Sequence, residues 1–211
     1  MKTLCLTLLI AITGFSLPAF AQLEVQIGAG ALFSDMNEVF DGPSSSTATS
    51  GDASIRPYFN GLVGTSFTEK WNIRARLVGT SRAEKYVGAP LGIEAFTYSA
   101  YYFDLGAELQ WKPVSLLGLS VGPYYSLDTY ERVTSAGSSV KPIVELYDNY
   151  VSIRPAVEVF FGPLVARLET SFGVTPAQRL MYTDANGQPA GEVSRYWNGA
   201  SVGLSYRLIK A

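Results

Sequence analysis

The chain has 211 residues, of which 47% are hydrophobic and only 16% are charged, whereas about a quarter of the residues in an ordinary soluble domain are charged. Its net charge of −2 shows no basic excess, which argues against nucleic acid as a partner. The sequence contains no histidine, and Cys5 is its only cysteine. It therefore lacks the residues for histidine-based acid–base catalysis, for Ser/His/Asp or Cys/His nucleophiles, and for zinc sites. We predict that the protein is not an enzyme and uses no metal or other cofactor.

The first 21 residues have the pattern of a secretory signal peptide. A positively charged start precedes an almost entirely apolar run from Leu4 to Leu17, and Ala19 and Ala21 place small residues before the expected cleavage site. Pro18 interrupts the apolar run before it reaches the roughly 20 residues of a membrane-spanning helix. We expect cleavage after Ala21, which leaves residues 22–211 as the exported domain.

Eight later segments carry an apolar side chain at every second position, the period of a strand with two different faces. In the clearest of them, Tyr101–Trp111, six apolar residues share one face, and a tyrosine with glycine, acidic and amide residues shares the other. Three of the segments contain prolines, Pro57, Pro123 and Pro155, which cannot donate to a strand ladder and indicate bulges. The eight segments cover residues 23–33, 55–67, 71–81, 101–111, 117–127, 151–161, 164–174 and 196–208.

The connections between these segments alternate between short and long. The short ones are Thr68–Lys70, Lys112–Val114 and Gly162–Pro163, and the long ones cover residues 34–54, 82–97, 128–149 and 175–195. Short turns at one end and long loops at the other are typical of outer-membrane barrels. The sequence therefore predicts an all-β fold, an eight-stranded antiparallel up-and-down transmembrane β-barrel.

A soluble barrel of the lipocalin type is the rival fold, because it alternates equally well but turns its apolar face inward. The polar face of this sequence is rich in glycine and serine, and the lysines after the signal peptide fall in predicted turns, loops or the tail. The apolar face carries aromatic residues at both ends of the strands, as membrane interfaces require. These predicted girdles consist of Phe33, Phe67, Trp71, Tyr101, Trp111, Tyr125, Phe161, Tyr196 and Tyr206.

The inward face carries an almost balanced set of charges. Counting from the Gly162–Pro163 turn sets Glu158 directly opposite Arg167, so we expect reversal of Arg167 to impair folding and simultaneous reversal of Glu158 to restore part of it. Eight strands enclose an interior that side chains can just fill, which favours a packed ion-pair network over an ion path. The predicted set is Glu24, Arg56, Arg74, Arg76, Asp104, Glu108, Arg154, Glu158, Arg167, Glu169 and Arg207, with Glu24 near Arg207 and Arg74 near Glu108.

The last predicted strand resembles the assembly signal of the small outer-membrane β-barrel family, which includes OmpA-, OmpX- and PorT-like proteins. Ser201, Gly203, Tyr206 and Leu208 provide a polar residue, a glycine and two hydrophobic positions spaced by one, although the family usually ends in an aromatic residue where Leu208 stands. The resemblance implies insertion by the outer-membrane assembly machinery. It also implies a structural, adhesive or secretion-accessory role, because the lipid-modifying enzymes among such barrels rely on a histidine.

We therefore predict a protein of the cell outer membrane, surrounded by lipid, with a side-chain-filled lumen and long extracellular loops that make surface interactions. The loop from Ser34 to Ser54 contains Asp35, Glu38, Asp41 and Asp52 and no basic residue, so it is expected to attract cations or basic proteins. Simple solvation of such loops is an equally good interpretation. A narrow solute channel, an accessory component of secretion or envelope assembly, and a soluble periplasmic ligand-binding barrel remain as alternatives.

Overall fold

The computed structural model describes residues 22–41, 54–86, 96–135, 149–183 and 189–210. All regular structure within these ranges is β-strand. The described residues contain no helix that is long and apolar enough to cross a membrane. The predicted signal peptide lies outside the described residues. The strands are β1 (Leu23–Asp41), β2 (Ser54–Ser66), β3 (Trp71–Tyr86), β4 (Phe96–Val114), β5 (Leu117–Ser135), β6 (Tyr150–Phe161), β7 (Leu164–Gly173), β8 (Gln178–Thr183) and β9 (Pro189–Lys210).

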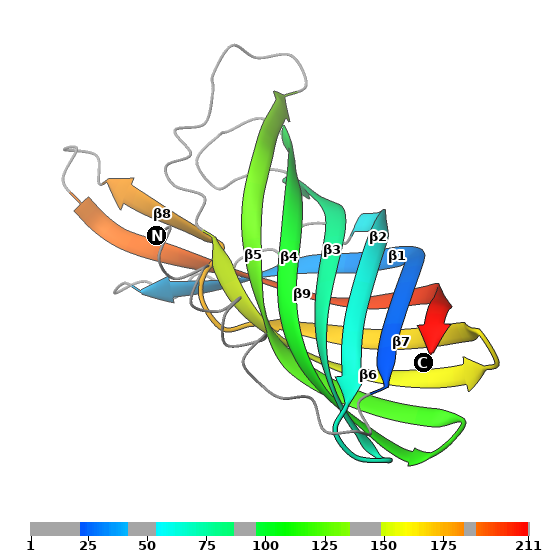
Figure 1. Ribbon diagram of the computed structural model, residues 1–211. Helices are drawn as coiled ribbons and strands as arrows, with labels where there is room; N and C mark the ends of the chain where they lie inside the picture. The colour runs from blue at the N-terminus through cyan, green and yellow to red at the C-terminus, as the bar shows by residue number, and fades with distance from the viewer. Residues whose placement is uncertain (1–21, 42–53, 87–95, 136–148, 184–188, 211) are drawn as a thin grey trace, which may run out of the picture.

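Each strand pairs antiparallel with its neighbour, and the pairing of β1 with β9 closes the sheet into a barrel (Figure 1). The short strands β7 and β8 pair with successive parts of β9. They therefore occupy one position in the wall, which gives a barrel of eight positions. The predicted eight-stranded antiparallel barrel is confirmed.

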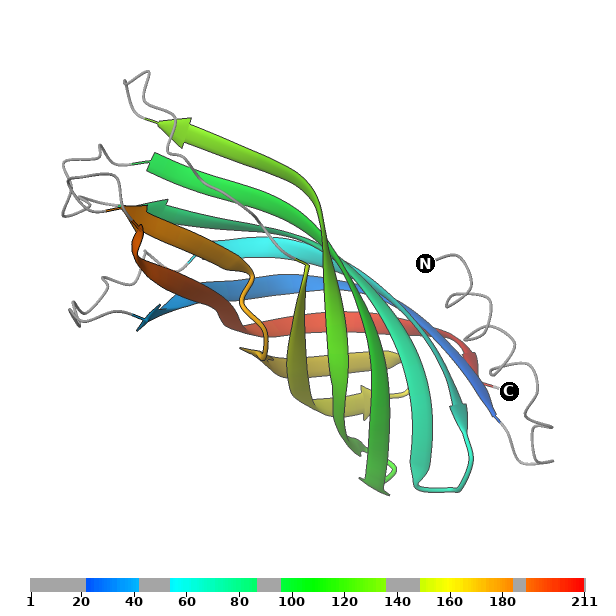
Figure 2. The same ribbon diagram turned by 90° about the vertical axis from the view of Figure 1, so that its left-hand side faces the viewer.

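Several strands are longer than the sequence pattern predicts, because the ladders continue past the point where the apolar alternation ends. β1 was expected to end at Phe33 but continues to Asp41, and the expected loop 175–195 contains β8 and the start of β9. Figures 1 and 2 show these extensions as two diverging ribbons, one formed by β3, β4 and β5 and the other by β1, β8 and β9. Backbone pairing needs no apolar side chains, so hydropathy alone underestimates strand length.

Two of the three predicted short turns are present. Residues 67–70 connect β2 to β3, with the Trp71 N–H donating to the Thr68 hydroxyl at 3.0 Å. Gly162–Pro163 connects β6 to β7, and Gly162 has a φ of 62°, a conformation that favours glycine. The third prediction, Lys112–Val114, is wrong. β4 continues through Val114 past an irregularity in its pairing with β5, and the turn consists of Ser115 and Leu116.

The prolines within strands do not produce the bulges that were expected. The β4–β5 register is the same on both sides of Pro123, and the β6–β7 register is the same on both sides of Pro155. Pro57 stands just beyond Tyr58, the last residue of β2 that pairs with β3. A proline removes one donor without adding a residue, so the ladder is interrupted while the residue count stays in step.

The two faces of the wall differ in the way the alternation predicts. Apolar side chains such as Ile27, Phe59 and Leu168 point outward and are more than half exposed. Charged, amide and tyrosine side chains point inward, and along β6 buried and less buried positions alternate without interruption. This arrangement is the reverse of a soluble barrel, whose apolar face lines the interior.

Candidate functional site

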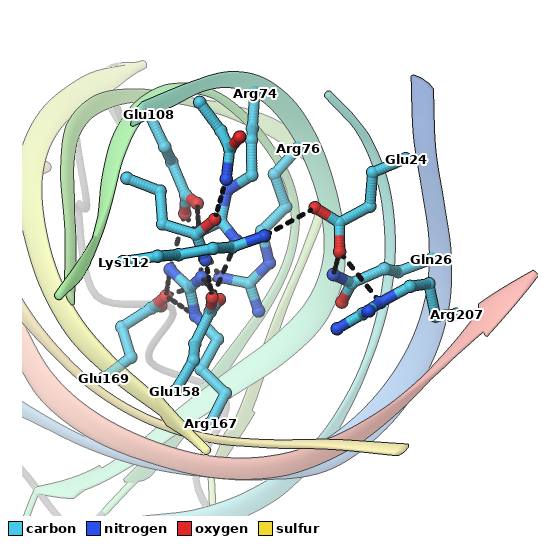
Figure 3. Close-up of polar contacts among 12 residues, drawn as sticks. Glu24, Gln26, Arg74, Arg76, Glu108, Lys112, Glu158, Arg167, Glu169 and Arg207 are labelled. Atoms are coloured by element: carbon cyan, nitrogen blue, oxygen red, sulfur yellow. Dashed lines mark hydrogen bonds and ion pairs between the residues drawn. The ribbon is translucent and has the colours of Figure 1, made fainter. Parts of the chain in front are cut away.

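Four arginines and four carboxylates lie buried in the middle of the lumen, each with no more than 5% of its surface exposed. Four positive and four negative charges leave this group formally neutral. They come from β3, β4, β6 and β7. The register pairs Arg74 with Glu108 across β3 and β4, and Glu158 with Arg167 across β6 and β7. This central charge cluster consists of Arg74, Arg76, Asp104, Glu108, Arg154, Glu158, Arg167 and Glu169 (Figure 3).

Arg167 joins three carboxylates in this cluster. Its guanidinium lies 2.5 Å from Glu158 and 2.6 Å from Glu169, and it also forms an ion pair with Glu108. The planar guanidinium has five donors, so one arginine can satisfy several acceptors at once. Figure 3 shows the three carboxylates converging on this side chain. The opposition of Glu158 and Arg167 expected from the turn is therefore one contact among several.

The other arginines connect the same carboxylates to one another. Arg74 forms an ion pair with Glu108 and lies 2.7 Å from Glu158, which it also binds by a hydrogen bond. Arg76 forms an ion pair with Glu169. Arg154 lies 2.6 Å from Asp104 and 3.8 Å from Glu169. The cluster is thus continuous, with no charge isolated from its opposite.

Two uncharged residues that the sequence analysis missed complete the central charge cluster. The Tyr124 hydroxyl donates to Glu108, and the Gln110 amide donates to Glu158. The Arg154 guanidinium lies 4.3 Å from the centre of the Tyr124 ring, within the range of a cation–π contact. Both residues occupy inward positions in the alternation, so the signal was present. They were overlooked because only charged residues were counted.

A second, smaller group lies nearer the short turns and is called here the turn-end cluster: Glu24, Gln26, Lys112 and Arg207. The Glu24 carboxylate lies 3.0 Å from Arg207, 3.6 Å from Lys112 and 2.8 Å from the Gln26 amide. Lys112 was expected in a turn, but β4 continues past it, and its side chain points toward Glu24 (Figure 3). One carboxylate here faces two cations.

One predicted member does not join either cluster. Arg56 is half-buried, and among the described residues it makes no ion pair. It stands beyond Tyr58, where the β2–β3 pairing ends. β3 therefore does not pair with β2 at Arg56.

Aromatic side chains fill the lumen on the side away from the short turns. Tyr102 and Tyr150 meet edge to face, with ring centres 5.7 Å apart, and Trp197 is only 2% exposed. A cavity lined by Arg154, Glu169 and Trp197 has a volume of about 10 Å³, enough for a single water molecule. Charges and aromatic rings thus occupy most of the interior at this level.

Glycines on the inward face make room for the side chains of Tyr58 and Tyr124. A Cβ added at Gly106 would lie 2.3 Å from the Tyr124 ring, and one at Gly203 would lie 2.0 Å from the Tyr58 hydroxyl. Both distances are too short for any side chain. The glycine of the predicted assembly signal therefore also has a packing role, while its recognition by assembly machinery stays a prediction.

The predicted girdle residues lie on the outer face, and two of them, Trp71 and Trp111, pair across β3 and β4 with ring centres 6.2 Å apart. Tyr196 is half-buried. In the predicted assembly signal, Ser201 and Gly203 face the lumen, whereas Tyr206 and Leu208 are about half exposed outside. More than a third of the surface is exposed at Phe33, Phe67, Trp71, Tyr101, Trp111, Tyr125, Phe161 and Tyr206.

No protein-family model and no curated protein sequence matches the chain. Among solved structures it is similar to the outer membrane protein OprG of Pseudomonas aeruginosa, with a TM-score of 0.52 and 10% identity over 88% of this chain and 96% of that one. It is also similar to Ail of Yersinia pestis (TM-score 0.41, 11% identity, 86% and 99% covered) and to the outer membrane protein AlkL (TM-score 0.45, 11% identity, 87% and 90% covered). At these identities the likeness to OprG shows the fold alone: an eight-stranded barrel of the outer-membrane type.

Proposed function

We propose that the protein is an outer-membrane β-barrel with a closed lumen, which acts as a structural and surface-interaction protein of the cell envelope. The observation that carries this proposal is the inversion of the two faces. Large apolar side chains such as Phe59 and Leu204 are more than 60% exposed, while four arginines of the lumen are almost fully buried. Such an exterior is stable only in lipid, and in lipid only a closed barrel satisfies every backbone group of a sheet.

Cell fractionation with a gel-mobility comparison tests the membrane assignment. We expect the chain in the outer-membrane fraction, extracted only by detergent, and we expect unboiled and boiled samples to migrate differently because folded barrels resist unfolding. Release from envelopes without detergent would contradict the proposal and favour a soluble ligand-binding barrel.

The closed lumen is supported by the continuity of the central charge cluster. Each of its charged side chains has an oppositely charged partner within the cluster, so an ion entering this level would have to displace paired groups from a space of low dielectric. We expect purified protein to give no steady conductance in planar bilayers. Steady single-channel steps would favour the alternative, a narrow solute channel.

The surface interactions are assigned to the long connections between strands. Asp35, Glu38 and Asp41, which were expected in a loop, belong to the extended part of β1. Their side chains, like Asp52, lie outside the described residues, so this part of the proposal rests on their charge alone. Cationic ligands or basic proteins are the partners that acidic loops would attract. Contact with the insertion machinery during biogenesis, and an accessory role in secretion or envelope assembly, are further proposals. Pull-downs in mild detergent test both.

A further inference from the structure

A groove of about 750 Å³ crosses the outer surface of β2, β3 and β4. Its walls are Phe59, Leu77 and Phe103, and its floor lies at Gly61 and Gly79. Gly79 pairs with Phe59 on one side and with Phe103 on the other, so the gap it leaves lies between two aromatic rings. The volume is within the range of about 300–1,000 Å³ that is typical of small-molecule sites.

These two glycines differ from the glycines that face the lumen. A Cβ added at Gly61 would meet no atom within 4 Å, and one at Gly79 would make only ordinary contact with Phe103, at 3.4 Å. Neither has the positive φ that favours glycine, which the structure shows at Gly162. Glycine weakens a strand interior, yet here neither packing nor backbone conformation requires it. The open space itself is the feature that these glycines preserve.

We propose that this groove binds one acyl chain of a bilayer lipid, an inference that rests on the outer-membrane location proposed above. The walls are half-exposed apolar side chains, continuous with the outward face that lipid would cover. The end of the groove away from the short turns is lined by Ser81, Tyr101 and Thr129, which carry hydroxyl groups. An apolar floor with hydroxyls at one end matches an acyl chain whose polar linkage lies toward the membrane surface.

Photolabelling locates the chain. The full protein is folded into vesicles of phosphatidylcholine that carries a photoactivatable diazirine in one acyl chain, and labelled peptides are quantified by mass spectrometry. We expect the peptides of β2, β3 and β4 around the groove to be labelled about fivefold more than the equally apolar outer face around Leu168 and Leu204. Even labelling of a folded barrel around its circumference would overturn the proposal.

Substitutions that fill the groove provide the second arm. Gly61→Leu and Gly79→Leu, alone and together, should lower labelling at the groove to the level of the outer surface around Leu168 and Leu204. Ala107→Leu, which adds the same side chain to the outer face of β4 away from the groove, should leave it unchanged. Unchanged labelling in the filled variants would contradict the proposal, as would crosslinked pairs of chains joined at the groove, which would identify a second copy as its occupant.

The gel-mobility shift separates the two proposals. A chain that fails to shift in vesicles has not folded into the membrane, which contradicts the proposed function. A chain that shifts but labels evenly contradicts only the lipid site. Because the wild-type labelling pattern needs no substitution, the proposal is tested even if a filled variant does not fold.

Discussion

The two charged groups of the lumen differ in balance and in burial. The central charge cluster has four cations against four anions, and its side chains are at most 6% exposed. The turn-end cluster has one carboxylate, that of Glu24, against Lys112 and Arg207, and the Lys112 side chain is 20% exposed. Positive and negative charges are equal in number where water is excluded, and they are unequal where water can enter.

This difference follows from the cost of burying charge. Without water, an unpaired charge loses its solvation and regains it only from protein groups, so each central group needs several partners. At the open end, water solvates the charges and salt screens them, so a surplus cation costs little stability. The comparison teaches that equal-looking ion pairs in one lumen should have unequal effects on stability.

Reversal of Arg167 should have the largest effect. Arg167→Glu would leave Glu108, Glu158 and Glu169 facing a fourth carboxylate, and removing even one partner of a buried pair costs about 3–5 kcal/mol. This is a large part of the roughly 5–15 kcal/mol that holds a typical domain folded. We expect the variant to lose the gel-mobility shift after refolding into vesicles.

The structure also changes the expectation for the compensating substitution. Adding Glu158→Arg restores one contact. However, it places the new cation beside Arg74, which lies 2.7 Å from Glu158, and Glu108 and Glu169 still lack the cation at position 167. We therefore expect little recovery in the double variant, measured by the same shift. Recovery close to wild type would mean that the pairs act independently and that the central charge cluster is not shared.

Removal of one hydroxyl should have a medium effect. Tyr124→Phe removes one of several hydrogen bonds to the Glu108 carboxylate, which keeps Arg74 and Arg167, and a hydrogen bond to a charged group contributes about 1.5–3 kcal/mol. The neighbouring Tyr125 points outward and is 44% exposed, so Tyr125→Phe is the matched control, expected within about 0.5 kcal/mol of wild type. Urea unfolding from vesicles measures both, and equal losses would contradict the assignment of the two faces.

Substitution of the surplus cation should have the smallest effect. Lys112→Met keeps the aliphatic stem, and Glu24 still has Arg207 at 3.0 Å, so we expect a loss of about 0.5 kcal/mol. Added salt should shrink this difference, because the lysine is partly exposed. A loss as large as that of Tyr124→Phe, unchanged by salt, would mean that the turn-end cluster behaves like the buried one.

Much of the lumen could be predicted from counting alone. A tight turn fixes the register of a hairpin, so the position of Gly162–Pro163 was enough to set Glu158 opposite Arg167. Closure of the barrel brought Glu24 to Arg207 in the same way. Arg56 was placed in the network because it lies at an inward position, but an inward position alone does not bring an acid near it. Lys112 escaped the prediction because the turn was placed three residues too early.

The sequence by itself determined the barrel, its two faces and the charges of its interior, because strand alternation and short turns are local properties of the chain. Only the tertiary structure decided which charges share partners, since Arg167 pairs with Glu108 and Arg76 pairs with Glu169 across strands that are distant in sequence. The same holds for the role of each glycine. Gly106 makes room for a ring inside and Gly61 leaves a groove outside, a difference that depends on what the curved wall brings near each residue.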